Sequence, residues 1–248
     1  MSFRVLMYHE LRDRSVNKVE GFSAIQVAQD YEDQLPPVLF TYVDDFKAQM
    51  QFLKENDYHL LSMQEVRDFY EKGSTLPEKA VLLTFDDAFQ SVYELAYPVL
   101  KELGMQATLF VVRGWLNKAT MPFDPTRSVV MSEAQLAEIK DVFTLANHST
   151  NLHTKAGAGK SAVQTVGLQA LKEDLAYCAE IVDEPHAFAY PFGFVDAEQD
   201  PAHLKEAGID LAFTTTGGKN DRTTNPYFLH RETVVLGITM EAFKLLID

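Results

Sequence analysis

The residues best suited to chemistry are two adjacent aspartates, Asp86 and Asp87, which follow the apolar run Ala80–Phe85. Ionised carboxylates are strongly disfavoured in an apolar interior unless they are paired or bind a metal ion. At the carboxyl end of a strand, however, such a pair is displayed at the edge of the sheet. Two histidines, His148 and His153, offer imidazoles that could complete a site with Asp87. Two imidazoles and one carboxylate suit Zn2+ or a similar divalent ion, with open positions left for water and substrate.

The five-residue separation of the two histidines requires a particular local structure. On a regular helix His148 and His153 would lie about 140° apart, so they converge only if residues 149–152 form a turn or an irregular start to a helix. Ser149 and Thr150 can bond to backbone groups in such a turn. The alternatives are that His148 caps a helix, that His153 is a surface-loop histidine, and that the aspartates end a strand and cap the next helix.

The other polar groups acquire roles if the metal site forms. Neighbouring residues of a strand point to opposite faces, so Asp87 is expected to bind the ion. Asp86 is then left beside a water molecule, from which it would take a proton as general base. His9 ends another predicted strand and could protonate a leaving amine. The alternative is a packed or exposed His9 with no catalytic role.

Apolar strands and amphipathic helices alternate along the chain about six or seven times. Strands are predicted at residues 3–8, 59–61, 80–85, 107–112, 142–146, 187–189, 211–215 and 233–236. Helices are predicted at residues 44–56, from Ser62 to Gly73, 91–103 with a kink at Pro98, from Ser132, 168–182, 202–207 and from about 240. Residues 12–42 are predicted to form a long irregular loop, of a length that is usually functional.

This alternation shows no break in composition and no internal repeat, and it predicts a parallel sheet with crossover helices. For residues 1–248 one α/β domain is favoured over two, as a distorted or incomplete (β/α) barrel with about seven parallel strands. The polar clusters all follow predicted strands: His9, Asp86 with Asp87, His148, and the segment after Tyr190. Because chemistry in such folds lies at the carboxyl ends of strands, we expect one shared site.

Composition excludes several classes of function. The formal net charge of -14 argues against partners such as nucleic acid and anionic membrane surfaces. The single cysteine, Cys178, excludes an internal disulfide and falls on the apolar face of a predicted helix. No apolar run approaches the length of a membrane span, and the first apolar segment is too short for a signal peptide. A cytoplasmic protein is expected from the sequence as written, or an extracellular one if a signal has been removed.

Three motifs in order resemble the polysaccharide deacetylases with NodB homology, carbohydrate esterase family 4. They are Thr84–Asp87, His148–His153 and Ala189–Gly193. The histidine spacing, with its Asn-Leu-His ending, is similar to the branch that de-N-acetylates poly-β-1,6-N-acetylglucosamine. In that branch the motifs are circularly permuted, so the strand that ends in the catalytic-acid histidine comes first, and Val5–His9 matches it. The resemblance extends over nearly the whole chain.

The resemblance implies a role for each matching residue. Asp87, His148 and His153 would bind the metal ion, most simply Zn2+, with Co2+ or Ni2+ as alternatives. Asp86 would be the general base and His9 the general acid. The implied reaction removes N-acetyl groups from a poly- or oligosaccharide that contains N-acetylglucosamine, and it releases acetate.

The resemblance also implies that the backbone N–H of Phe192 would help to stabilise the oxyanion.

Two positions of the sequence depart from the family pattern. The family usually carries an arginine two residues before Pro191 that braces the catalytic aspartate, but Ala189 stands there. Arg231 is the candidate to supply that cation from another strand. Ala88 stands where a glycine is common after the two aspartates.

Substrate contacts and rival functions are less specific. Residues near the motifs are candidates for packing on sugar faces, with core or loop packing as the alternative: Tyr190, Pro191, Trp115 and Tyr42. One rival is a cytosolic metal-dependent amidase or imidase that acts on a small non-sugar amide. Another is a catalytically silent carbohydrate-binding domain, although such a domain needs no base beside a metal. A structural zinc site is disfavoured because it usually has four protein ligands.

Overall fold

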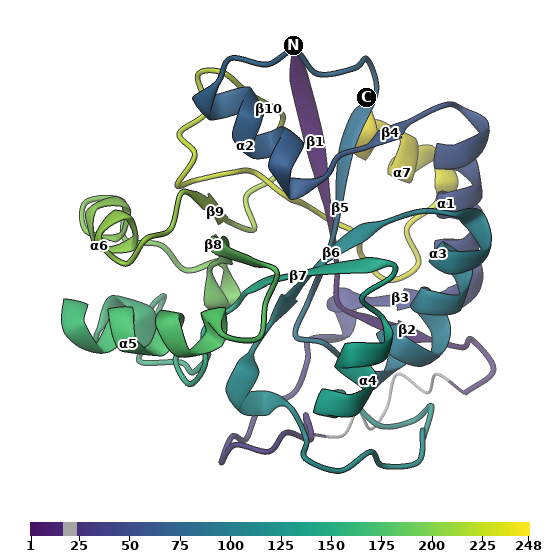
Figure 1. Cartoon of the computed structure of the whole chain (residues 1–248). Coiled ribbons are helices and arrows are strands. Elements are labelled where there is room, and N and C mark those ends of the chain that lie inside the picture. The colour runs from purple at the N-terminus through teal and green to yellow at the C-terminus, as the bar shows by residue number, and fades with distance from the viewer. Residues whose placement is uncertain (17–23) are drawn as a thin grey trace.

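The computed structural model describes residues 1–16 and 24–248, which form a curled sheet surrounded by helices (Figure 1). The hydrogen-bonded path through the sheet runs β10-β1-β5-β6-β7-β8-β9. These strands are β1 (Ser2–Tyr8), β5 (Ala80–Asp86), β6 (Ala107–Val111), β7 (Phe143–Asn147), β8 (Glu184–Ala189), β9 (Leu211–Phe213) and β10 (Asn220–Asp221). Two short strands lie beside this path: β4 (His59–Leu60) pairs with β5, and β11 (Glu232–Thr233) pairs with β1.

The pairings in this sheet are parallel except for the antiparallel contact of β10 with β1. The sheet curls into a half-barrel whose path is open between β9 and β10. This confirms the predicted incomplete (β/α) barrel with about seven strands. The carboxyl ends of the parallel strands therefore meet on one side of the molecule, where the sequence predicts the site.

Helices cover the sheet on several sides (Figure 1). α1 (Val43–Glu55) packs against α3 (Tyr97–Leu103) and α7 (Met240–Ile247), whereas α5 (Leu168–Ala179) packs against β7, β8 and α6 (Asp200–Glu206). The other α-helices of the described residues are α2 (Met63–Glu71) and α4 (Glu133–Glu138). Among the described residues, no helix combines the length and apolar character that crossing a bilayer requires.

Alternate residues of the strands face in two directions. One set forms a buried cluster with side chains of α2, and it includes Phe3 and Val5 of β1, Ala80 and Leu82 of β5, and Phe110 of β6. The other set packs outward with α1, and it includes Leu6, Leu83, Leu109 and Leu145. Asp86 shares the alternation of Ala80 and Leu82, so its side chain belongs to the inner set at the carboxyl end of β5.

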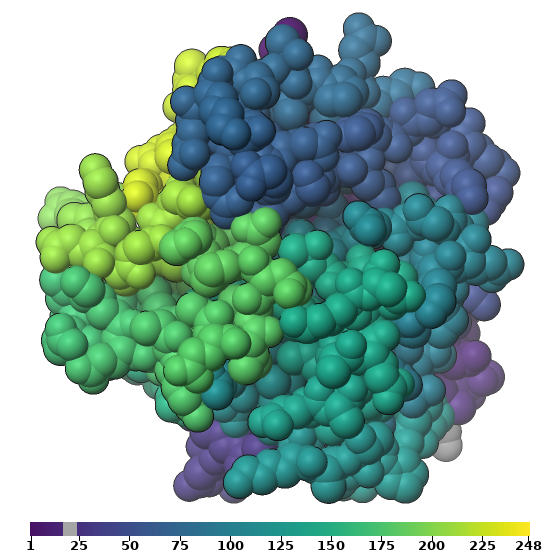
Figure 2. Space-filling view, in the orientation of Figure 1, coloured from purple at the N-terminus to yellow at the C-terminus, as the bar shows by residue number. Residues whose placement is uncertain are grey.

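Helix α2 is tied to the far edge of the sheet by ion pairs. Arg67 bonds to Glu184 of β8 and to Asp210 just before β9, each at 2.8 Å. The space-filling view shows blue and green segments against one another on this face of the molecule (Figure 2). These ion pairs hold α2 at the amino ends of β8 and β9.

Most predicted elements are present, with ends that differ by a few residues. The helices predicted to start at Ser62 and Ser132 do so, each with a capping box: Ser62 with Glu65, and Ser132 with Gln135. The predicted helix at 91–103 is divided into a π-helical segment, Val92–Ala96, and α3. Pro98 lies in the first turn of α3, where a missing N–H is tolerated.

The prediction of one irregular loop over residues 12–42 is wrong in part. β2 (Glu10–Arg12) and β3 (Phe40–Tyr42) form a separate parallel pair, and a 3-10 turn at Pro37–Leu39 precedes β3. Strands of three residues are too short to show a hydrophobic period. Residues 17–23 of the predicted loop lie outside the described residues.

Candidate active site

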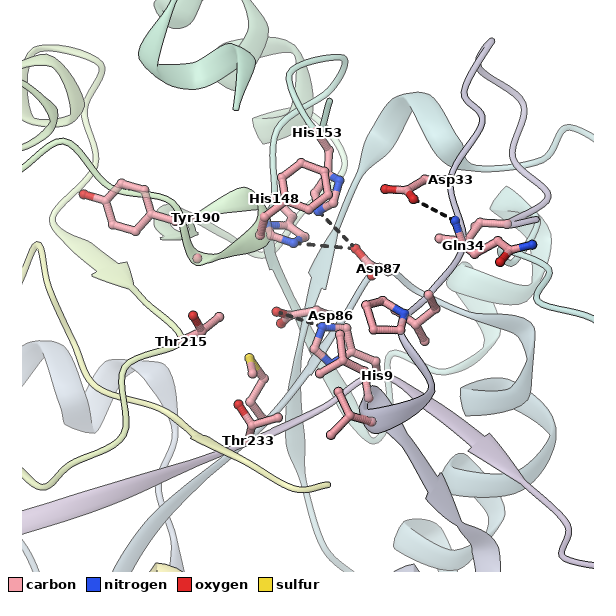
Figure 3. Close-up of a pocket in the computed structure, with 18 of the residues that line it drawn as sticks. His9, Asp33, Gln34, Asp86, Asp87, His148, His153, Tyr190, Thr215 and Thr233 are labelled. Carbon is pink, nitrogen blue, oxygen red and sulfur yellow. Dashed lines mark hydrogen bonds and ion pairs between the residues drawn. The ribbon is translucent and has the colours of Figure 1, made fainter. Parts of the chain in front are cut away.

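A cavity of about 470 Å³ lies at the carboxyl ends of the strands. His9 follows β1, Asp86 ends β5, His148 follows β7 and Tyr190 follows β8, and all four line this cavity. The segment before α1 forms much of another wall through Ile25, Tyr31, Asp33, Leu35, Pro36 and Leu39. Figure 3 shows the two aspartates between the histidines in this space. The single shared site that the strand ends predict is therefore present as a cavity.

Asp87, His148 and His153 form a compact buried triad. Asp87 Oδ1 lies 3.6 Å from His148 Nε2 and 3.5 Å from His153 Nε2, and one ligand atom from each residue lies within 4.8 Å of the others. A tetrahedral ion with bonds of about 2.0 to 2.2 Å places its ligands about 3.3 to 3.6 Å apart. Asp87 Oδ1 has no hydrogen-bond partner among the described residues. A buried carboxylate oxygen without a donor fits a metal ligand.

The electrostatics of the triad also fit a cation. Burial, followed by the neighbouring Asp86 carboxylate, raises the pKa of Asp87 well above its usual range. Burial lowers the pKa of His148 and of His153, so both imidazoles are neutral. A divalent cation favours an ionised carboxylate and neutral imidazoles. The three residues can therefore hold such an ion.

The two histidine rings are oriented by different contacts. His148 Nδ1 lies 2.8 Å from the carbonyl oxygen of Ala189, to which it can donate. That bond leaves Nε2 free to face Asp87. The His153 ring instead packs between Trp115 and Phe192, with both ring centroids at 4.5 Å. Trp115 is thus a support for a candidate metal ligand.

Asp86 is held by Arg231. The guanidinium donates to both carboxylate oxygens, each at 2.7 Å, and its Nε donates to the carbonyl oxygen of Thr214. Arg231 is fully buried, and the position in the motif that lacks an arginine, Ala189, is also buried. Burial alone would raise the pKa of Asp86, but Arg231, His148 and His9 outweigh it and lower the pKa to about 2. Asp86 is therefore ionised at neutral pH.

Both aspartates line the same cavity, so the expectation that strand alternation separates them is wrong. Asp86 ends β5 on the inner face, but Asp87 has a φ of 72° and Ala88 a φ of 56°. These left-handed residues end the extended strand, so the next carboxylate does not alternate to the outer face. Ala88 occupies a conformation that glycine adopts without strain.

His9 lies on the other side of Asp86 from the triad (Figure 3). Its Nε2 is 3.9 Å from Asp86 Oδ2. Burial is the main influence on its pKa and lowers it to about 4, despite the opposing effect of Asp86. His9 is therefore neutral at pH 7 and must gain a proton before it can donate one.

The other predicted site residues occupy different places. Phe192 lines the cavity with a φ of 60° in a 3-10 turn, Pro191–Gly193. Tyr190 is buried, and its hydroxyl donates to the carbonyl oxygen of Tyr227; Figure 3 shows its ring directed away from the aspartates. Pro191 and Tyr42 do not line the cavity, and Arg14 covers the Tyr42 ring. These positions favour packing over sugar contact for Tyr190 and Tyr42.

Sequence reasoning missed three polar residues that line the cavity, Tyr31, Asp33 and Lys155. Lys155 forms an ion pair with Asp33 and lies 5.3 Å above the ring of Phe192. Tyr31 donates to the same Asp33 carboxylate and packs on Trp115. For Asp33 and Tyr31 the length of the predicted loop at residues 12–42 was the available signal, because irregular segments carry no periodic pattern that identifies individual wall residues.

The fold and the site together define an α/β protein of the incomplete-barrel type with a candidate metal centre at the ends of its strands. A family model described as polysaccharide deacetylase matches residues 73–212. The chain belongs to the polysaccharide deacetylase family. It is accordingly a hydrolase of carbon–nitrogen bonds other than peptide bonds, as the sequence predicted.

Individual relatives agree with this assignment. The poly-beta-1,6-N-acetyl-D-glucosamine N-deacetylase of Staphylococcus aureus is 24% identical over 98% of this chain and 80% of its own length. The Streptococcus pyogenes deacetylase PplD has a TM-score of 0.76 at 22% identity, covering 100% of this chain and 99% of that one. IcaB from Ammonifex degensii has a TM-score of 0.68 at 23% identity, covering 99% and 95%. The two solved structures share the fold of this chain.

The matched segment does not contain every candidate site residue. Residues 73–212 include both aspartates, both histidines of the triad and Phe192. His9 and Arg231, which flank Asp86, lie outside it on either side. The residues next to the candidate base thus come from near the two ends of the chain.

Proposed function

We propose that the chain is a metal-dependent de-N-acetylase that removes acetyl groups from N-acetylglucosamine-containing poly- or oligosaccharides. The observation that carries the proposal is the Arg231–Asp86 pair beside the buried triad of Asp87, His148 and His153. The name of the S. aureus relative supports an N-acetylglucosamine polymer as the substrate class. We also infer that residues 1–248 act as one catalytic domain, because both ends of the chain contribute to the site.

Asp87, His148 and His153 would hold the divalent ion, with Zn2+ as the first choice and Co2+ or Ni2+ as alternatives. Bound there, the ion would polarise the amide carbonyl and lower the pKa of water. Asp86 and the triad line the same cavity, so a water molecule and the amide carbonyl could lie beside both the ion and Asp86.

Asp86 is the group that takes the proton from the attacking water. Its ionised state is secured by Arg231, which also fixes the direction of both carboxylate oxygens. Because a pKa of about 2 makes it a weak base, it holds the proton only briefly. His9 lies 3.9 Å from Asp86 Oδ2 and is neutral, so it can receive that proton.

His9 then protonates the nitrogen as the C–N bond breaks. Water supplies the hydroxyl group that acetate gains and the proton that the amine gains, so atoms and charge balance without another reactant. The backbone N–H of Phe192, at the edge of the cavity, is the proposed donor to the developing oxyanion.

A second candidate is a metal-dependent amidase or imidase that acts on a small non-sugar amide. The aliphatic wall favours it, since Ile25, Leu35, Val38, Leu39 and Val235 line the cavity. Sugar-binding sites usually present polar partners for hydroxyl groups, and these side chains have none. The two functions share the mechanism and differ in the substrate.

Acetate release tests the proposal. The metal-free protein is supplied with Zn2+, Co2+ or Ni2+ and incubated with β-1,6-linked and β-1,4-linked N-acetylglucosamine oligomers, and with small linear and cyclic amides. We expect metal-dependent acetate release from an oligomer, and none from Asp87→Ala. Hydrolysis of the small amides alone would establish the amidase function instead.

A further inference from the structure

We propose that Asp174 of α5 is a positioning residue for the metal centre, because its carboxylate fixes the turn that joins His148 to His153. This inference rests on the proposed metal dependence of the site. Among the described residues, Asp174 forms no hydrogen bond or ion pair with either histidine. It acts on the three-residue segment Ser149–Asn151, whose shape brings the two imidazoles to the same point.

The carboxylate of Asp174 bonds to two successive amides of the turn. Thr150 N donates to Oδ1 at 2.7 Å, and Asn151 N donates to Oδ2 at 2.7 Å. The Thr150 hydroxyl also donates to the carbonyl oxygen of Asp174, at 2.8 Å. Hydrogen bonds from N–H groups to an ionised acceptor are short and strong. Two such bonds to one rigid group leave the turn little freedom to rotate.

The rest of the turn is held from its other sides. Ser149 has a φ of 73°, and its N–H donates to the side chain of Asn147, which donates in turn to the carbonyl oxygen of Leu175. The carbonyl oxygens of Ser149 and Thr150 accept hydrogen bonds from the N–H groups of Arg113 and Gly114. Hydrogen bonds from helix α5 on one side and from the segment after β6 on the other therefore hold the turn in place.

This arrangement explains how a five-residue spacing gives a metal site. A regular helix would separate the two rings by about 140°, and the left-handed Ser149 breaks any helical path between them. A left-handed residue that is not glycine persists where its surroundings impose it. Asp174 is the only ionisable side chain that bonds to the amides of this turn in the described residues.

The nature of the side chain is as important as its place. Asparagine at this position would retain one acceptor oxygen, but its NH₂ group would face the N–H of the other residue and repel it. Alanine would leave both amides without this acceptor, and one of them belongs to the buried Thr150. Both changes should loosen the histidines without removing a ligand atom.

The test measures metal affinity and needs no turnover. Zn2+ binding to the metal-free protein is followed by competition with a chromogenic chelator, and Co2+ binding by its visible absorption spectrum. Weakened support of ligands lowers metal affinity by about 10- to 100-fold, and we expect Asp174→Asn and Asp174→Ala to fall in that range. The Co2+ spectrum of Asp174→Asn should also change, since the ligand geometry is altered.

The neighbouring Glu173 provides a matched control on the same helix. It is exposed, and its carboxylate accepts a hydrogen bond from Gln169 instead of reaching the turn. Glu173→Gln should bind Zn2+ and Co2+ as the wild type does.

Each outcome separates the two proposals. A wild-type affinity and an unchanged Co2+ spectrum in Asp174→Asn would overturn the positioning role while leaving the proposed function intact. A wild-type protein that binds none of the divalent ions would overturn the metal-dependent function and this inference with it. If Asp174→Ala does not fold, Asp174→Asn carries the test, and hydrogen exchange at Thr150 and Asn151 in the metal-free protein should be faster than in the wild type.

Discussion

Asp86 and Asp87 are neighbours in the chain, and their pKa values are displaced in opposite directions. Arg231 leads the charges that outweigh burial at Asp86, where the pKa falls to about 2. No arginine forms an ion pair with Asp87 among the described residues, so burial and the adjacent carboxylate raise its pKa despite the weaker effect of Arg231. Groups whose environments displace their pKa values apart are suited to different tasks. Asp86 is ionised before any metal ion binds, whereas a bound cation would favour the ionised form of Asp87.

This division predicts different consequences for two substitutions. Asp86→Asn should lower kcat by about 10²- to 10⁴-fold, the usual range for loss of a general base, while Zn2+ affinity is retained. Asp87→Ala should instead reduce Zn2+ affinity, because it removes a ligand. Steady-state kinetics and chelator competition measure the two effects. Loss of metal by Asp86→Asn would show that the assigned roles are exchanged.

The Arg231–Asp86 pair also predicts a loss of stability. Arg231→Met leaves Asp86 buried without its partner, and breaking a buried pair costs about 3 to 5 kcal/mol. The free energy of unfolding, measured with urea, should fall by that amount. Arg14 also pairs with two carboxylates, Asp44 and Asp45, but on the surface, so Arg14→Met should cost less than about 1 kcal/mol. Equal losses in the two variants would contradict the prediction.

His9 predicts a dependence of stability on acid pH. Burial lowers its pKa from 6.5 to about 4, so between these values the unfolded chain binds the proton and the folded chain does not. The stability associated with neutral His9 is therefore complete above pH 6.5 and declines as the pH falls toward 4. Between pH 7 and pH 4.5, the free energy of unfolding of metal-free His9→Gln, measured with urea, should fall by about 2 to 3 kcal/mol less than that of the wild type. Parallel curves would exclude this cause.

At the scale of elements, periodic segments could be predicted and strand ends could not. The stripe of Phe46, Met50 and Leu53 is buried on α1 as its spacing requires, and the capping box at Ser62 begins α2. The two-residue pair β10–β1 and the strands β2 and β3 are too short for any period to appear. Asp87 shows the other limit, because a single left-handed residue changes the direction of a side chain without a sequence signal.

Some residues of the candidate site could likewise be predicted from the sequence, and others could not. Asp86, Asp87 and His148 were identifiable because each follows a recognisable strand, and His153 because it shares a motif with His148. Asp33 and Lys155 were not, since they meet across more than 120 residues of chain. Whether a remote arginine reaches Asp86 depends on the pairing of strands, which the sequence alone leaves open.

The close packing around the turn between His148 and His153 predicts that replacing Gly114 lowers stability and Zn2+ affinity. A Cβ on Gly114 would lie 2.5 Å from the carbonyl oxygen of Thr150, so Gly114→Ala must displace the turn or the segment after β6. Such overpacking costs about 1 to 3 kcal/mol, and Zn2+ affinity should fall as well. Gly167→Ala is the control, because its Cβ would meet no atom within 4 Å. Wild-type stability and affinity in Gly114→Ala would show that the contact is easily relieved.

At the scale of the whole molecule, the site depends on a strand from the start of the chain. β1 lies between β5 and β11, and it pairs with both in parallel. The register places Tyr8 opposite Phe85, so His9 and Asp86 follow side by side, while Leu6 lies opposite Glu232, next to Arg231. Residues more than 200 positions apart in the sequence thus meet at Asp86. The site forms only when the half-barrel is assembled.

Metal binding should therefore stabilise the whole molecule. The triad draws ligands from the ends of β5 and β7, which are distant in the unfolded chain, so the ion binds the folded state preferentially. At a Zn2+ concentration about 100 times Kd, the gain is about 2.7 kcal/mol, which raises Tm by about 5 to 10 °C in a chain of this size. Calorimetry of the metal-free protein with and without Zn2+ measures this shift, and a chelator should reverse it. Asp87→Ala should show no comparable shift; an equal rise in that variant would mean that the ion binds elsewhere on the protein.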